Sequence, residues 1–347
     1  MNASSTLDTL AGERAERAAG RLKAAARWRV AEFALWIAAL ALVFLFPGRA
    51  LLFNEVAILA LLALSLDLIL GYAGIVSLGH GAYFGVGAYA AGLLAVAGGG
   101  AAPLSDPLLG LVFAAFVSGL VGFLTSFLVL RGADLTRLMV TLGVALIFGE
   151  LANRMAWLTG GADGLQGVAP SKLLGVFEFD LSGRTAYLYS LTVLFLLFVL
   201  ARTLVHSPFG ISLRAIKGNI LRAGAVGVPV RNRLVAVYTI GAAYAGIAGA
   251  LLAQTTQFVS LDVLDFHRSA DTVLIVVFGG LGTLYGSIVG AAIFKAVYDV
   301  LGAATPQYWQ FWLGLILVLL VLFVRGGVMG LLASMRSRFN RDKGAGS

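Results

Sequence analysis

The side chains that usually carry out chemistry are sparse in this chain and do not form a catalytic or metal-binding set. The sequence has 3 His, no Cys and 17 Asp and Glu among its 347 residues. No His or carboxylate group has the spacing of metal ligands, and Ser77 and Ser207 have no base placed beside them. The phosphate-binding pattern GxxxxGK[ST] is also absent, which excludes ATP hydrolysis by that route. We therefore expect this chain to be no enzyme and to hold no cofactor or metal of its own.

Ionisable residues lie instead inside long apolar runs. A charge in the middle of a membrane costs about 2.5–3.5 kcal/mol on insertion scales, so each one needs a partner or a function. Glu150 and Arg154 are four residues apart on one helix face, either as a mutual ion pair or as part of the outer mouth of a pathway. Asp271 has only Arg268 nearby and precedes a glycine-rich break, so we expect it to line a solute pathway.

Polar residues also occur in a glycine-rich segment, 71–94. His80 fits a buried neutral imidazole bonded to a backbone carbonyl, and the alternative is a gate or pH sensor. Structural roles are expected for Asp67 and for the Lys295–Asp299 pair. The candidate residues of a solute pathway are Ser77, His80, Tyr83, Glu150 and Asp271.

The composition predicts that most of the chain is dissolved in lipid. The chain is 60% hydrophobic and 12% charged, whereas soluble domains carry about 25% charged residues. Unbroken apolar runs such as 188–201 and 312–324 favour helices over the alternating strands of a barrel. The fold class predicted is an all-α polytopic membrane protein with about ten transmembrane helices, short and glycine-broken ones included, and both termini cytoplasmic.

The net charge of +8 indicates topology rather than a nucleic-acid partner. Lys and Arg gather in residues 1–32, 131–137, 202–233 and 325–343, all expected on the cytoplasmic side, where they also meet anionic lipid. We divide the chain into a cytoplasmic amphipathic arm, 1–32, a transmembrane domain, 33–325, and a cytoplasmic basic tail, 326–347.

Two glycine-rich breaks lie in opposite halves of the chain, near residues 80 and 282. Glycine at this density favours close helix packing or a helix broken beside an aqueous pathway. The residues assigned to these breaks and their packing are Gly79, Gly81, Gly85, Gly282, Gly286 and Gly290.

A basic segment without acids, 202–233, separates two apolar runs and includes the predicted cytoplasmic segment 206–233. Phe209, Leu213, Ile216 and Ile220 recur at helical spacing and form one apolar face. Arg214, Lys217 and Arg222 are expected on the face turned away. This helix either lies on lipid headgroups or is gripped by a soluble partner.

Three segments together resemble the permeases of branched-chain amino acid ABC importers, in particular the subunit type with a TGG–GL loop. They read SLDLILGYAGIVSLGHGAYFGVGAYAAGLL at 65–94, TGGADGL at 159–165, and LRAIKGNILRAGAVGV through GGLGTLYGSIVG within 213–290. The resemblance covers roughly 33–325, and the family includes urea, amide and aromatic-acid relatives. It implies a multi-pass protein of the bacterial inner membrane.

The resemblance also implies partners. They are a second homologous permease, two cytoplasmic ATP-binding subunits that hold ATP and Mg²⁺, and an external substrate-binding protein. It further implies that LRAIKGNILRAGAVG couples to an ATPase, through Phe209, Leu213, Arg214, Ile216, Lys217, Ile220, Ala223 and Gly227. Relatives often carry acids where this chain has Gly218 and Asn219.

The sequence therefore predicts a permease subunit of an ATP-driven importer, with branched-chain amino acids as the expected solutes. Urea, short amides and aromatic acids are the alternatives within the family. Outside it, a motor-independent secondary transporter would use Glu150 and Asp271 as ion sites.

Overall fold

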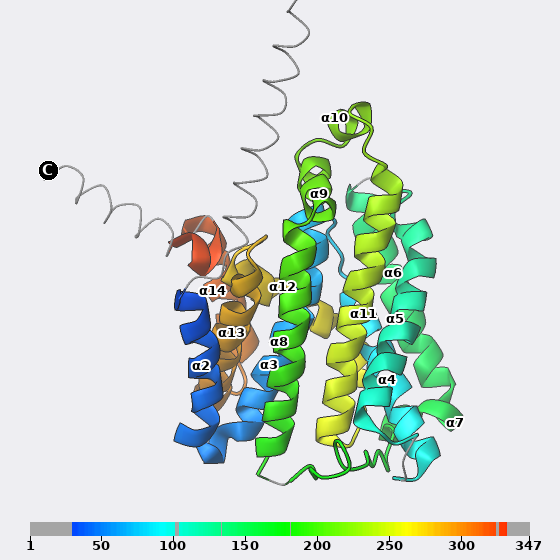
Figure 1. The fold of residues 1–347 in the computed structure, drawn as a ribbon, viewed down its shortest axis with the longest axis vertical. Coiled ribbons are helices and arrows are strands. Elements are labelled where there is room, and N and C mark those ends of the chain that lie inside the picture. The colour runs from blue at the N-terminus through cyan, green and yellow to red at the C-terminus, as the bar shows by residue number, and fades with distance from the viewer. Residues whose placement is uncertain (1–29, 101–103, 133, 181, 324–325, 332–347) are drawn as a thin grey trace, which may run out of the picture.

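The computed structural model describes residues 30–100, 104–132, 134–180, 182–323 and 326–331, and within them the fold is helical (Figure 1). The longer helices are α2 (Val30–Leu45), α3 (Ala50–Asp67), α4 (His80–Gly98), α5 (Pro107–Val129), α6 (Asp134–Arg154), α8 (Arg184–His206), α9 (Pro208–Gly218), α11 (Val230–Thr256), α12 (Phe266–Gly279), α13 (Leu284–Ala304) and α14 (Trp309–Phe323). Short elements are η1 (Pro47–Arg49), the π-helical turn η2 (Leu68–Tyr72), α7 (Ala156–Thr159), η3 (Gly161–Asp163), α10 (Ile220–Ala225) and η4 (Leu261–Leu264).

Seven helices in these described ranges are long and apolar enough to cross a membrane, so the polytopic all-helical prediction is confirmed. The other segments counted toward about ten spans are shorter helices, α2, α12 and α14, of 16, 14 and 15 residues. The sidedness of the termini stays a prediction. The arm, 1–32, and the tail, 326–347, fall mostly outside the described residues.

Local sequence explains where several helices begin. Asp106 caps α5 by accepting a bond from Leu108 N at 2.9 Å, and Pro107 occupies the first turn, where a missing N–H costs nothing. Pro208 starts α9 in the same way after the extended residue Ser207. Asn219 is extended, ends α9 and caps α10 through a 2.9 Å bond from Arg222 N.

Helix α11 lies in the middle of the bundle, against α3, α4 and α5. Its small residues allow this approach: a Cβ added to Gly249 would lie 1.9 Å from the Phe84 carbonyl oxygen of α4. At the end of α11 remote from α10, the TGGADGL loop is tied down by paired backbone bonds between Leu165 and Val259, of 2.8 and 3.2 Å. We call the two ends of the bundle the α10 end and the loop end.

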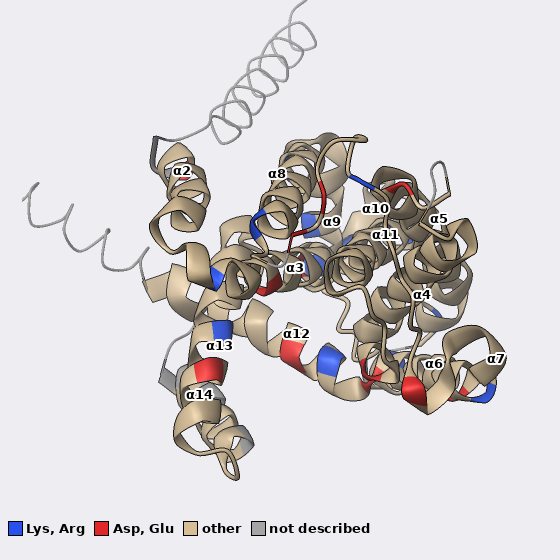
Figure 2. Cartoon of the chain, turned by 90° about the horizontal axis from the view of Figure 1, so that it is seen from below, with Lys and Arg blue, Asp and Glu red and all other residues tan. Residues whose placement is uncertain are grey.

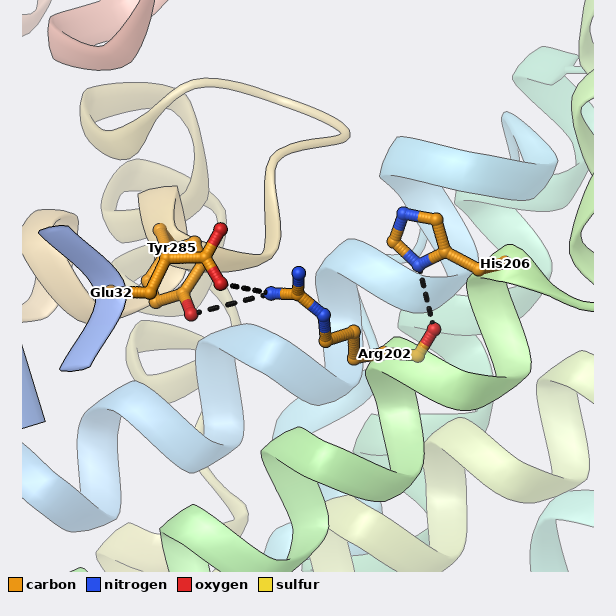
Figure 3. Close-up of polar contacts among 4 residues, drawn as sticks. All are labelled: Glu32, Arg202, His206 and Tyr285. Carbon is orange, nitrogen blue, oxygen red and sulfur yellow. Dashed lines mark hydrogen bonds and ion pairs between the residues drawn. The ribbon is translucent and has the colours of Figure 1, made fainter. Parts of the chain in front are cut away.

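A buried ion pair joins α2 to the bundle (Figure 3). Arg202 Nη1 of α8 lies 2.6 Å from Glu32 Oε2, and the side chains are only 9% and 16% exposed. The same nitrogen donates to the Tyr285 hydroxyl of α13 at 3.4 Å. Arg202 is therefore a buried link between three helices, which the sequence analysis had grouped with the cytoplasmic cations of 202–233.

Replacing Arg202 with Leu will destabilise the protein by about 3–5 kcal/mol, because Glu32 is left as an unpaired buried charge. The double variant Glu32→Leu/Arg202→Leu will recover most of that loss. The apparent Tm of the purified chain in detergent measures both effects. As a control, Arg154→Leu breaks the exposed Glu150–Arg154 pair and will change stability by no more than about 1 kcal/mol. A single variant as stable as this control would contradict a structural role for the buried pair.

Candidate transport site and motor junction

Helix α9 is built into the α10 end of the bundle through its apolar face. Leu213 and Ile216 are each only 1% exposed and pack with α8, α11 and η2. Beside them, Lys217 Nζ donates a 2.6 Å hydrogen bond to the Gly71 carbonyl oxygen. Gly71 lies in η2, where α3 ends in a π-helical turn. Helix α9 is thus bonded directly to the first glycine-rich break.

Asp67 connects the first break to the second. This residue is fully buried at the end of α3, and its Oδ1 accepts a 2.7 Å bond from Gly282 N, in the turn between α12 and α13. A Cβ on Gly71 would lie 2.1 Å from Asp67 Oδ1 and 2.6 Å from Gly282 N. Gly282 also has φ +74, a conformation that favours glycine. Two segments 215 residues apart therefore meet at one carboxylate. We call Asp67, Gly71, Lys217 and Gly282 the junction.

The other glycines assigned to the breaks also lie against backbone or side chains. An added Cβ would come within 3 Å of a heavy atom in each case. The neighbours are Thr141 O for Gly79, Ser269 Oγ for Gly81, Leu264 Cδ2 for Gly85, Thr283 Oγ1 for Gly286 and Ile275 O for Gly290.

The predicted single apolar face of segment 206–233 is wrong in one respect. Asn219 breaks the helix, so Ile220 belongs to α10 and is exposed. Leu213 and Ile216 lie on α9 and are buried. Phe209 is partly buried against the core, and Arg233 lies over its ring at 5.2 Å.

Arg214 and Lys217 of α9 were expected to point away from the protein, but both donate hydrogen bonds to backbone carbonyls. Arg214 Nη2 donates to Val205 O at 2.9 Å, and Lys217 binds Gly71 as described. Beyond α9, the α10 turn carries exposed apolar side chains: Leu221 and Val226 are each 84% exposed. Ala223 is buried at the base of α10, and Gly227, with φ +90, follows it. In Figure 1, α10 projects from the end of the bundle.

The polar residues of α4 lie in packed protein. His80 Nε2 is 2.7 Å from Ser65 Oγ, and that hydroxyl donates in turn to Leu62 O at 2.5 Å. The single hydroxyl proton is used on Leu62, so His80 donates through Nε2. The expected backbone-carbonyl partner of His80 is therefore wrong, and a serine takes that place.

Tyr83 forms a second buried contact, with Thr125 Oγ1 at 2.8 Å and the Tyr238 hydroxyl at 3.0 Å. Ser77 is fully buried as well. None of Ser77, His80 and Tyr83 lines the large cavity described next, so their pathway role stays a prediction. Glu150 pairs with Arg154 at 2.7 Å on the exposed face of α6.

Asp271 does line a cavity, of about 740 Å³, toward the loop end of the bundle. Helices α3, α12, α13 and α14 form most of its wall. Lys295 faces it from α13 and is paired with Glu55 at 2.6 Å and Asp299 at 3.0 Å. The Lys295–Asp299 pair is predictable from its i,i+4 spacing, whereas Glu55 is remote in sequence and gives no such signal.

Comparison with known protein families identifies the family of this chain. The model for the branched-chain amino acid transport system permease component matches residues 49–324. This chain belongs to that permease family. The permease is also 30% identical over 307 residues to the high-affinity branched-chain amino acid transport system permease protein LivM of Escherichia coli K12, covering 82% of this chain and 70% of LivM.

Two further relatives agree with this assignment. LivM of Salmonella typhimurium is 32% identical over 292 residues, covering 78% of this chain and 67% of that protein. The autoinducer 2 import system permease protein LsrC of Enterobacter sp. strain 638 is 29% identical over 287 residues, covering 81% and 79%. No solved structure matches this chain.

The permease is thus a transport subunit of the ABC importer class and not an enzyme. It is a multi-pass membrane protein homologous to bacterial inner-membrane permeases, and LivM-like permeases function in ABC complexes. The motor-independent transporter considered from the sequence is set aside on this ground.

Substituting Gly71 with Ala will force the Asp67–Gly282 bond apart, because the new methyl group would overlap both partners. Overpacking of this kind costs about 1–3 kcal/mol, so the apparent Tm in detergent will fall. The matched control is Gly143→Ala in α6, where no heavy atom lies within 4 Å of the new Cβ. If both variants melt like the wild-type permease, the close packing of the junction is refuted.

Proposed function

We propose that this permease forms half of the translocation pathway of an importer for branched-chain amino acids. The observation that carries the proposal is the family match over 49–324, together with LivM among the relatives at about 30% identity. In this proposal the second half is a homologous permease, and an external binding protein delivers the solute. Residues 33–325 are the membrane domain, and the α10 end faces two cytoplasmic ATPases that bind ATP and Mg²⁺.

The geometry supports a division of labour within the coupling segment, 206–233. The apolar face of α9 is already buried in this chain, so it has nothing left to offer a motor. The exposed apolar side chains Leu221 and Val226 of the α10 turn are free to enter a groove on an ATPase. We assign docking to α10 and transmission to α9. Lys217 of α9 belongs to the junction, where it is bonded to Gly71.

Transmission would follow from this connectivity. A displacement of α9 pulls on Gly71 through Lys217, and Asp67 ties the same place to Gly282. Helices α12 and α13 meet at Gly282, and both line the 740 Å³ cavity. The motor could therefore open and close the solute-facing helices without touching them, as hinge motions of a few residues commonly do.

Uptake of labelled solutes tests the substrate class. Cells expressing the complete importer, compared with a strain lacking this permease, will accumulate labelled leucine in a permease-dependent way. Urea, an aromatic acid and autoinducer 2 serve as competing solutes, the last because of the similarity to LsrC. Permease-dependent uptake of one of these without leucine uptake would overturn the branched-chain assignment.

Placing Asp at both Leu221 and Val226 will prevent the ATPase from co-purifying with the permease. Each buried apolar side chain contributes about 1.5–3 kcal/mol, so losing two weakens docking by at least about a hundredfold. Val176→Asp is the control, because Val176 is 72% exposed in the loop between α7 and α8. Asp at Leu213 or Ile216 is a poor test, because these side chains are core.

The pull-down uses tagged permease from native membranes in mild detergent, with partner chains identified by mass spectrometry. Normal recovery of the ATPase with the double variant would contradict docking through α10.

A further inference from the structure

The large cavity near the loop end carries two neighbouring side chains of opposite charge. Arg268 and Asp271 both line it from α12, and each is half-buried. Neither makes a side-chain hydrogen bond or ion pair with another residue in the part of the chain that the structure describes. By contrast, Lys295 in the same wall is held by Glu55 and Asp299. Ionisable groups at membrane depth are costly, and Arg268 and Asp271 act on each other through space without a direct bond, so both can still hydrogen-bond a ligand.

Helix geometry places the two charges close together on the cavity side. Arg268 and Asp271 are three residues apart, and side chains at this spacing are neighbours, with Cβ atoms roughly 5–6 Å apart. Ala270 and Leu274 continue the same wall. Ser269, Thr272 and Ile275 of the same helix are buried in the bundle. Figure 2 shows acidic and basic positions along α12, next to the α13–α14 pair.

The remaining wall is mainly apolar. Ile58 and Leu59 of α3, Phe84 of α4, Leu252 of α11 and Leu274 of α12 contribute to it. The cavity thus combines the cation and the carboxylate of α12 with an apolar surface, and Asp262, Asp265 and His267 add ionisable groups near the start of α12. A volume of about 740 Å³ is within the usual range of small-molecule sites, about 300–1,000 Å³.

We propose that this cavity binds the solute as a zwitterion, with Arg268 on the α-carboxylate, Asp271 on the α-ammonium and the apolar wall on an aliphatic side chain. This inference rests on the proposed function, and it adds the part of the solute that the permease itself recognises. A zwitterionic α-amino acid satisfies both charges at once. A solute with only one of the two groups leaves the other side chain unpaired, which costs affinity.

Helix α12 connects the proposed solute site to the junction. Ser269 Oγ accepts a 2.8 Å bond from Gly81 N, which fixes the start of α12 on α4. The other end of α12 leads to Gly282, which is bonded to Asp67. A rigid 14-residue helix therefore runs from the charged pair to the junction. Movement at the junction would shift Arg268 and Asp271 against the rest of the wall and release the solute.

A cysteine placed in the wall tests the proposal, since the natural chain has no Cys. Ala270→Cys is expressed within the complete importer in membrane vesicles, and its modification by a small thiol reagent is followed on this chain by mass spectrometry. Leucine at about ten times its Kd will slow modification by about tenfold, because only the empty cavity reacts. Leucinamide, which lacks the carboxylate, and 4-methylpentanoate, which lacks the amine, will protect far less at the same concentration.

Variants then separate the two roles. Adding Arg268→Gln will abolish the advantage of leucine over leucinamide, and adding Asp271→Asn will abolish its advantage over 4-methylpentanoate. Lys172→Gln is the matched charge control, since Lys172 pairs with Glu178 on an exposed loop, and it will leave protection unchanged. Val176→Cys reports general reagent access and will react equally with and without leucine.

The outcomes distinguish this inference from the proposed function. If the importer transports leucine but leucine does not protect the Ala270→Cys variant from the reagent, or if all three solutes protect it equally, the zwitterion site is wrong while the proposed function stands. If the importer transports another solute and not leucine, the proposed function itself fails.

Discussion

The contact between Asp67 and Gly282 is the constraint on which the rest of this permease depends. It joins the end of α3 to the turn between α12 and α13, and it exists only because Gly71 has no side chain to fill the same space. The side chain of Asp67 is fully buried, where losing a hydrogen bond is expensive, so the bond from Gly282 N to Oδ1 holds the two breaks together. The Lys217 bond to Gly71 brings α9 to the same point.

Around this point the helices are held together by two kinds of contact. Helices α4, α5 and α11 are held by close backbone approaches and by the buried contacts of Tyr83 with Thr125 and Tyr238. Helices α12 and α13 pack on α3, and their polar contacts with the rest of the bundle include those at Ser269, Gly282, Tyr285 and Lys295. Packed interiors switch between discrete arrangements rather than deforming gradually, so the proposed movement would shift α12 and α13 as packed units.

Periodicity and turn chemistry predicted much of this arrangement. Long apolar runs gave the spans, and the glycine-rich segment 71–94 marked where a helix breaks. The sequence also placed the charged pair Glu150–Arg154, because both residues lie on one helix within about one turn.

Contacts between residues remote in sequence could not be predicted in this way. The bond from Asp67 to Gly282 spans 215 residues, and the ion pair of Arg202 with Glu32 spans 170. The apolar face of α9 was predicted correctly at Leu213 and Ile216, but periodicity does not say whether such a face meets its own chain or a partner. Asn219 is extended and ends α9, so Ile220 begins α10 and does not share the apolar face of α9.

Amide hydrogen exchange of the complete importer tests the central claim, that the motor acts on the solute-facing helices through the junction. The complex is compared without nucleotide and with nucleotide trapped by vanadate. The account predicts that peptides covering 68–79 and 279–284 change their exchange together, while the interior of α5 does not change. Identical exchange at both segments in the two states, in a complex that hydrolyses ATP and transports its solute, would contradict it.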